Sequence, residues 1–208
     1  MNVKKEAVAV PTRTTNAAQS EATRAALMGA ARGLFAERGY AAVATEEIVR
    51  AAGVTRGALY HHFAGKEELF AAVYEEVEAD LVAEIGQVAT EAADPLDALH
   101  LGAAAFLEAC RRPEVQRITL IDAPSVLGWE RWREIGLKYG FGLIEEVLKA
   151  GMEQGVIEPQ PVRPLTHLLL GAMDEAAMLV ARSDDTELRE QVAASIDRYV
   201  DTLAPRPA

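Results

Sequence analysis

The sequence contains one cysteine, Cys110, in 208 residues. A single thiol cannot form an internal disulfide, which fits a reducing compartment, and we expect it to be inert rather than a redox sensor. No apolar run reaches the length that a membrane span requires. The first residues include Lys4 and Lys5 but lack the uninterrupted apolar segment of a secretory signal. We therefore expect a cytoplasmic protein without a membrane partner.

The sequence also lacks the short motifs of common enzyme classes. It has no GxSxG, HExxH or CxxC motif and no Walker loop for phosphate binding. Di-iron enzymes built on helical bundles need Glu-x-x-His pairs, and Asp97-x-x-His100 is a single imperfect match. We therefore expect no enzymatic activity, no catalytic residue, no metal site and no cofactor.

Charge is divided unequally along the chain, whose net charge is −11. Residues 1–66 contain nine Lys/Arg and five Asp/Glu, which gives +4, whereas residues 67–208 contain 12 and 27, which gives −15. Attraction to phosphates depends on charges within a Debye length of about 10 Å. The acidic remainder therefore does not exclude a nucleic-acid partner for the first part. We expect it to be an ordinary solvated surface, and the alternative is that it discourages non-specific binding.

The most informative stretch is residues 45–66, TEEIVRAAGVTRGALYHHFAGK. Thr45 is a candidate N-cap of one short helix, and Thr55 is a candidate N-cap of a second. Gly53 supplies a positive φ between the two helices, and apolar residues at helical spacing lie on one side of each. The pattern predicts a helix-turn-helix whose second helix is polar enough to enter a DNA major groove.

The rest of the chain is predicted to be helical, so the expected fold is all-α with about nine helices. Residues 1–19 show no sustained period and are predicted to form a mobile arm. Residues 20–66 are predicted to form the DNA-binding domain and residues 67–208 a helical domain. A break between two helices is expected at Ala123-Pro124-Ser125. The helices outside the motif are predicted at about 20–38, 66–89, 95–112, 114–122, 129–154, 162–182 and 185–203.

The motif and its surroundings resemble the DNA-binding domain of tetracycline repressor-like (TetR-type) transcriptional regulators. The resemblance covers about residues 20–82, and beyond them only the helical plan matches. It implies a repressor that binds a palindromic operator as a homodimer and is released by a small-molecule effector. The alternative is a DNA-binding regulator without an effector, whose bundle only dimerises or recruits a partner. The matching residues are Phe35, Gly39, Thr45, Ile48, Ala52-Gly53-Val54, Gly57, Leu59-Tyr60, His62-Phe63, Lys66 and Leu69.

The resemblance also places the second helix of the motif against double-stranded DNA. Arg56 is the best candidate for bidentate recognition of a guanine edge, and Lys66 is a candidate phosphate contact. Tyr60 could instead pack on the first helix. Glu46 could accept from a cytosine amine or complement a helix N-terminus. The expected DNA contacts are Thr45, Thr55, Arg56, Gly57, Ala58, Tyr60, His61, His62 and Lys66.

The last two long helices carry apolar stripes that the resemblance assigns to a dimer interface, and an ordinary monomer core is the alternative. The helix that starts at Lys66 leads from the motif into the bundle and is expected to act as a lever for an effector. Polar or large residues in otherwise apolar helices are candidates for lining its pocket, although each could be ordinary core, and Asp174 and Glu175 could form salt bridges across a dimer. The pocket candidates are His100, Phe106, Trp129, Trp132, Tyr139, Asp174 and Glu175.

Overall fold

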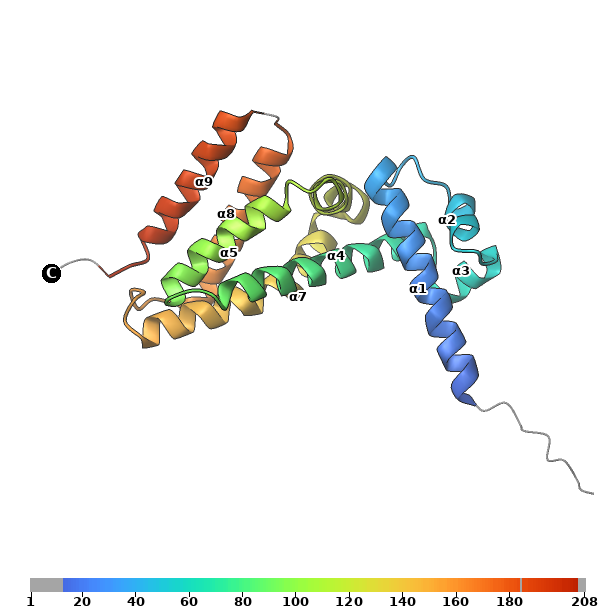
Figure 1. Cartoon of the computed structure of the whole chain (residues 1–208), viewed down its shortest axis with the longest axis horizontal. Helices are drawn as coiled ribbons and strands as arrows, with labels where there is room; N and C mark the ends of the chain where they lie inside the picture. The colour runs from blue at the N-terminus through green and yellow to red at the C-terminus, as the bar shows by residue number, and fades with distance from the viewer. Residues whose placement is uncertain (1–12, 184, 206–208) are drawn as a thin grey trace, which may run out of the picture.

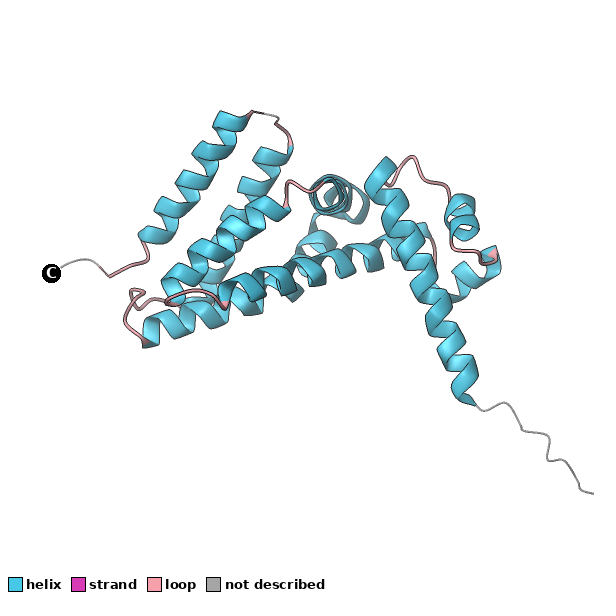
Figure 2. Cartoon of the chain, in the orientation of Figure 1, coloured by secondary structure: helices cyan, strands magenta, loops and turns pink. Residues whose placement is uncertain are grey.

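The computed structural model of the chain describes residues 13–183 and 185–205. Within these residues every regular element is a helix (Figure 2). Figure 1 shows a small group of helices near the N-terminus and a larger, elongated group that ends at the C-terminus. The all-α prediction is confirmed. The elements are α1 (Arg13–Arg38), α2 (Thr45–Ala51), α3 (Arg56–His62), α4 (Lys66–Ala89), α5 (Pro95–Ala109), α6 (Pro113–Val115), the π-helix η1 (Gln116–Asp122), α7 (Ala123–Glu153), α8 (Val162–Ala181) and α9 (Thr186–Asp201).

Helices α1, α2 and α3 form a head whose apolar side chains share a core with α4. Leu27, Ala31 and Phe35 recur at helical spacing on α1 and are fully buried. Ile48 of α2 and Leu59 of α3 are also fully buried and belong to the same core. Since each short helix buries only one side, its opposite side is left for solvent or a partner. The predicted helix-turn-helix is therefore present.

Helix α1 begins at Arg13, and not near residue 20 as the sequence predicted. Residues 16–19 are exposed, so this first part of the helix has no apolar periodicity that a sequence pattern could reveal. The predicted mobile arm is wrong for residues 13–19, which are helical. Residues 1–12 lie outside the described residues.

The two short helices start at different kinds of cap. Thr55 is the N-cap of α3, and its hydroxyl accepts a hydrogen bond from the N–H of Ala58 at 3.2 Å, as predicted. The N-cap of α2 is Ala44, and the prediction of Thr45 is wrong by one residue. The N–H of Ala44 donates to Oε2 of Glu47 at 3.0 Å, so a side chain inside α2 satisfies the backbone at its start. Gly53 has the predicted positive φ, 67°.

The predicted break at residues 123–125 is wrong. The chain passes from η1 directly into α7, because Pro124 lies in the first turn, where a helix needs no N–H donor. The break lies instead at Gly128, with φ 76° and ψ 162°, values that glycine adopts without strain. At the start of α5, Oδ1 of Asp94 accepts hydrogen bonds from the N–H groups of Leu96 and Asp97 at 2.9 Å each and so caps the helix. None of the described helices is both long and apolar enough to span a membrane.

The two threonines of the helix-turn-helix should differ in their contribution to stability. Thr55→Ala removes the cap of α3 and should lower the free energy of unfolding by about 1 kcal/mol. Thr45→Ala is the matched control, because Thr45 lies inside α2 and does not cap it, and it should change stability by less than about 0.5 kcal/mol. Urea unfolding followed by circular dichroism measures both. Equal losses in the two variants would contradict the assignment of the caps.

Candidate nucleic-acid interface and internal cavity

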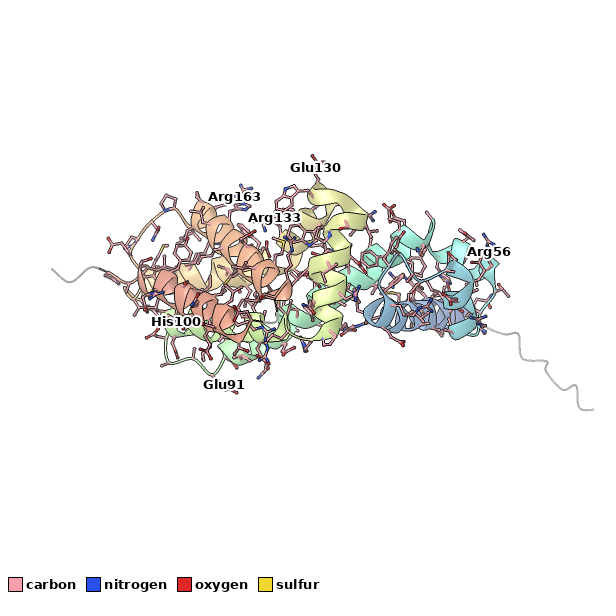
Figure 3. All side chains as sticks on the ribbon, turned by 90° about the horizontal axis from the view of Figure 1, so that it is seen from above. Arg56, Glu91, His100, Glu130, Arg133 and Arg163 are labelled. Atoms are coloured by element: carbon pink, nitrogen blue, oxygen red, sulfur yellow. The ribbon has the colours of Figure 1, made fainter. Side chains whose placement is uncertain are left out.

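The polar side of α3 is open to solvent. Arg56, Gly57 and His61 are exposed, and the Tyr60 side chain is 47% exposed, so Tyr60 is not part of the buried core of the head. Figure 3 shows Arg56 on the head, at the opposite end of the molecule from His100. The exposed side chains are backed by Leu59, which is fully buried. The helix therefore presents a polar surface on a rigid support.

The other predicted DNA contacts occupy the same region. Thr55 is exposed, and Thr45, Ala58 and His62 are half-buried. The rings of His61 and His62 lie 5.1 Å apart between centroids in an edge-to-face arrangement. In the part of the chain that the structure describes, no group of three or more His, Cys, Asp or Glu could hold a metal ion.

Arg56 is held by two neighbours on the surface of the head. Its Nη1 lies 2.8 Å from Oε1 of Glu46, and its Nη2 lies 3.4 Å from the hydroxyl of Tyr60. The hydrogen bond to Tyr60, followed by the charge of Glu46, raises the pKa of the guanidinium above its usual value. Since Arg56 and Glu46 are both exposed, their ion pair adds little stability and is easily exchanged for another partner. The guanidinium is therefore orientated yet free to bind a base edge.

Lys66 is turned inward in the free protein. Its Nζ donates to the carbonyl oxygens of Tyr40 and Val43, both at 2.9 Å, and lies 3.9 Å from the centre of the Tyr40 ring. Burial lowers the pKa of the ammonium. Lys66 therefore fixes the loop between α1 and α2 to the start of α4. A phosphate contact by its side chain stays a prediction.

The bundle encloses an internal cavity of about 120 Å³, lined by α4, α5, η1, α7, α8 and α9. Most of its wall is aliphatic, and a polar group of residues lies within this wall. Of the residues predicted to line a pocket, Phe106, Trp132 and Asp174 do so. The polar lining residues are Tyr74, Glu78, Thr119, Arg133 and Asp174.

Four of the predicted pocket residues do not line the cavity. Trp129 is 63% exposed, since it directly follows the break at Gly128, and Glu175 is exposed on α8. The Tyr139 hydroxyl donates to Oε2 of Glu75 at 3.0 Å. His100 lies between two acids of α9, with Nδ1 3.4 Å from Asp197 and Nε2 3.1 Å from Asp201. These four side chains face other surfaces, so they lie outside this cavity, and a role for them in binding a ligand stays a prediction.

Sequence analysis missed Glu78, which is the most deeply buried carboxyl of the cavity. It is 8% exposed, and burial followed by the charge of Asp174 raises its pKa to about 7, against a smaller opposite effect of a hydrogen bond with Tyr74. The sequence did contain a signal for its burial. Glu78 lies four residues after Tyr74 and three before Leu81, so all three share one side of a helix. Burial raises the pKa of Asp174 to about 6, although Nη1 of Arg133 lies only 2.5 Å from its Oδ2.

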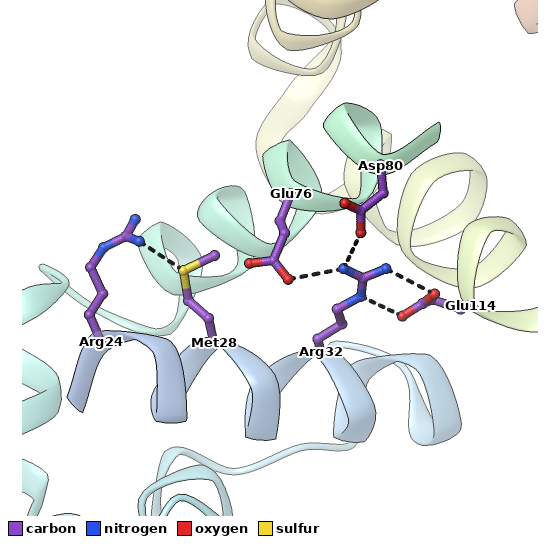
Figure 4. Close-up of polar contacts among 6 residues, drawn as sticks. All are labelled: Arg24, Met28, Arg32, Glu76, Asp80 and Glu114. Carbon is purple, nitrogen blue, oxygen red and sulfur yellow. Dashed lines mark hydrogen bonds and ion pairs between the residues drawn. The ribbon is translucent and has the colours of Figure 1, made fainter. Parts of the chain in front are cut away.

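An arginine network joins the head to the bundle (Figure 4). Arg32 of α1 bonds Oε1 of Glu114 at 2.6 Å through Nε, and its Nη1 lies 2.9 Å from Glu76 and 2.6 Å from Asp80. The bond to Glu114 is the main reason that the pKa of this guanidinium is raised. Since the three acids come from α4 and α6, Arg32 clamps α1 to both.

The π-helix η1 connects the cavity to the head within four residues. Thr119 and Leu120 line the cavity. Asp122, at the end of the same element, accepts a hydrogen bond from the N–H of Tyr40 at 2.7 Å through Oδ2. Gly39 lies so close that an added Cβ would be 3.3 Å from the same oxygen. A shift of η1 would therefore also move the loop between α1 and α2, which contains Tyr40.

An exposed recognition helix on a compact three-helix head, joined to a separate hollow bundle, defines a helix-turn-helix DNA-binding protein. Comparison with known proteins agrees. The family model described as "Bacterial regulatory proteins, tetR family" matches residues 27–73, and that described as "Tetracyclin repressor-like, C-terminal domain" matches residues 96–203.

Individual relatives extend this agreement along the chain. The A-factor receptor protein of Streptomyces griseus is 30% identical over 85% of this chain and 62% of its own length. The transcriptional repressor KstR2 of Mycobacterium tuberculosis is 30% identical over 69% of this chain and 73% of its own. A TetR-family regulator of known structure from Pectobacterium atrosepticum is 32% identical, with a TM-score of 0.82 over 95% of this chain and 100% of its own. The chain therefore belongs to the TetR family, and it is a DNA-binding regulator of transcription.

The buried carboxyl of Glu78 should make stability depend on pH. Folding raises its pKa from 4.5 to about 7, so between these values the folded state holds a proton that the unfolded state has lost. Stability should therefore fall as pH rises through this window. Glu78→Gln removes the titrating group, so its free energy of unfolding should not fall in this way. The difference in free energy of unfolding between the variant and the wild type should shift in favour of the variant by about 2 kcal/mol between about pH 5 and pH 8.

Urea unfolding at the two pH values measures this difference. The control is Glu146→Gln, because Glu146 is an exposed carboxyl of α7 outside the cavity lining. A pH-independent difference between the wild type and Glu78→Gln would show that the carboxyl is ionised throughout.

Proposed function

We propose that this protein is a transcriptional repressor that binds a palindromic operator as a homodimer and is released from it by a small-molecule effector. The observation that carries the proposal is the short route from an internal cavity to the recognition head. Thr119 lines the cavity, and Asp122, three residues later in the chain, holds the backbone of Tyr40 in the head. Since an effector shifts an equilibrium only by its preference for one state, a cavity tied to the head is a suitable place for that preference to arise.

For DNA recognition, we propose that α3 lies in the major groove with Arg56 on a guanine edge. The proposal is supported by the exposure of Arg56, Tyr60 and His61 along one helix. Glu46 and Tyr60 hold the guanidinium near the groove before binding, which reduces the entropy lost when it meets a base. The set of Thr45, Thr55, Gly57, Ala58 and His62 supplies the remaining contacts to phosphates and bases, and Lys66 acts by holding the loop before α2.

For assembly, we propose that α8 and α9 form the interface with a second copy. Leu168 and Leu179 of α8 are 62% and 45% exposed, although both are large and apolar. They lie eleven residues apart, which is close to three helical turns, so both lie on the same side of α8. Such exposed apolar side chains are favourable in an interface and costly in water. Two heads related by a two-fold axis would read inverted half-sites about one helical turn apart.

Arg56→Ala should weaken binding to a selected operator by about ten-fold or more and relax the preference at one base pair. The operator can be obtained by selecting bound duplexes from a random pool and scoring them for inverted symmetry. Arg163→Ala is a matched control, because it removes the same charge from an exposed position at the other end of the molecule (Figure 3).

Fluorescence anisotropy with the operator and with a scrambled duplex measures both variants. Lys66→Ala should weaken binding to both duplexes alike. An equal loss on the two duplexes for Arg56→Ala would refute its role in base recognition, and the absence of any inverted repeat among the selected duplexes would refute the palindromic operator.

A charge placed on the exposed side of α8 should break the proposed dimer. The double variant Leu168→Glu/Leu179→Glu should elute as a monomer under conditions in which the wild type elutes as a dimer, because a carboxylate would be buried without a partner. Ile121→Glu is the control, since Ile121 is also a large apolar residue, 41% exposed, but on η1. Light scattering after gel filtration gives the masses. A dimer that persists in the double variant would place the interface elsewhere.

A further inference from the structure

The polar part of the cavity contains a carboxyl that has no counter-ion among the residues that the structure describes. Two acids, Glu78 and Asp174, and one base, Arg133, line the cavity. Arg133 is engaged with Asp174 at 2.5 Å, and the charge of Asp174 acts on Glu78 with the same sign. The Tyr74 hydroxyl, a neutral group that donates to the carbonyl oxygen of Trp132 at 3.4 Å, has only a small opposite effect on the pKa of Glu78. When both acids are ionised, the cavity therefore carries one negative charge in excess, and the unpaired carboxyl is only 8% exposed.

A second polar atom in the same wall has no partner. The hydroxyl of Thr119 is buried and makes no hydrogen bond within the described chain. The carbonyl oxygen of the same residue is already engaged, since Nε1 of Trp132 donates to it at 3.1 Å. A buried hydroxyl that makes no hydrogen bond is costly, so it favours a ligand that supplies one. Thr119 and Glu78 come from different elements, η1 and α4, and both line the cavity.

The remainder of the lining is apolar and comes from every helix around the cavity. This apolar wall suits the hydrocarbon part of a ligand, and it has no polar group that could bind a second polar group of the ligand. A ligand carboxylate would lie near the carboxyls of Glu78 and Asp174. Arg133, which could balance its charge, is already paired with Asp174, so the cavity disfavours anions. The larger apolar lining residues are Leu81, Val82, Ile85, Leu99, Phe106, Leu143, Ile144, Val147, Leu169, Leu170 and Met173.

We propose that the effector is a small lipophilic cation, an amine with one apolar body, whose ammonium group binds Glu78 and the hydroxyl of Thr119. This inference rests on the proposed function in so far as binding is expected to release the operator. Binding would leave Glu78 ionised and paired, and the Thr119 hydroxyl would accept from the ammonium. The charged groups around Glu78 are Asp174 and Arg133, and the neutral Tyr74 hydroxyl and the Cys110 thiol also face it, the pKa of both being raised.

The probes are primary n-alkylamines from butyl to decyl, each compared with the alcohol and the carboxylate of the same chain length. Titration calorimetry on the full-length protein near neutral pH gives the dissociation constants. The best amine should bind about ten-fold more tightly than its alcohol, because a hydrogen bond to a charged group contributes more than a neutral one. Its carboxylate should bind more weakly than the alcohol.

Two variants test the assigned groups. Glu78→Gln should weaken the amine by about ten-fold and leave the alcohol within about two-fold, since only the charge is removed. Thr119→Val keeps the shape and should weaken the amine by about three- to ten-fold. Glu146→Gln is the matched control and should change neither. The same changes should appear as thermal shifts, which also show that each variant is folded.

The outcomes separate the two proposals. The head-group assignment is wrong if no amine binds, if the alcohol or carboxylate binds as tightly as the amine, or if Glu78→Gln leaves the amine unchanged. Operator release is followed in parallel by fluorescence anisotropy. Release by the alcohols and not by the amines would refute the lipophilic cation but keep the effector-released repressor. Tight, Glu78-dependent binding of the amine without release would support the assignment and refute release as the function of the site.

Discussion

Helix α4 belongs to the core of the head and to the core of the bundle at the same time. Phe70, in its second turn, packs edge-to-face against Phe35 at 5.3 Å and Tyr40 at 5.1 Å between ring centroids. Further along, Glu78 and Leu81 line the internal cavity. One continuous set of buried side chains runs from α1 along α4 to α7. Because a packed core resists gradual deformation, a rearrangement of the cavity wall would be transmitted to the head through this core.

Polar contacts set the orientation that the shared core permits. Arg32 clamps α1 to acids of α4 and α6, Lys66 fixes the loop before α2, and Asp122 binds the backbone of Tyr40. These contacts come from four elements and are directional, unlike apolar packing. A small displacement of η1 or α4 would exchange or break them, which gives a ligand in the bundle a physical means to affect α3.

Much of the local structure could be predicted because its causes are local. Thr55 caps one helix, Gly53 follows the end of another, and the apolar spacing of α2 and α3 marks their buried sides. The errors have local reasons as well. Residues 16–19 of α1 are exposed and so carry no apolar period, and Pro124 does not break the chain because the first turn of a helix tolerates proline.

The residues that line the cavity were harder to predict, because the lining depends on how six helical elements pack against one another. Trp132 and Trp129 lie in the same stretch of sequence, yet one lines the cavity and the other is exposed beside the break at Gly128. The sequence by itself determined the helices, the helix-turn-helix and the residues of its polar face, since these follow from spacing and capping within a few turns. Only the tertiary structure decided that Arg56 meets Glu46, that Glu78 has no counter-ion among the described residues and that η1 links the cavity to the head. These features depend on how separate helices pack, and Asp122 and Tyr40, for example, lie 82 residues apart in the chain.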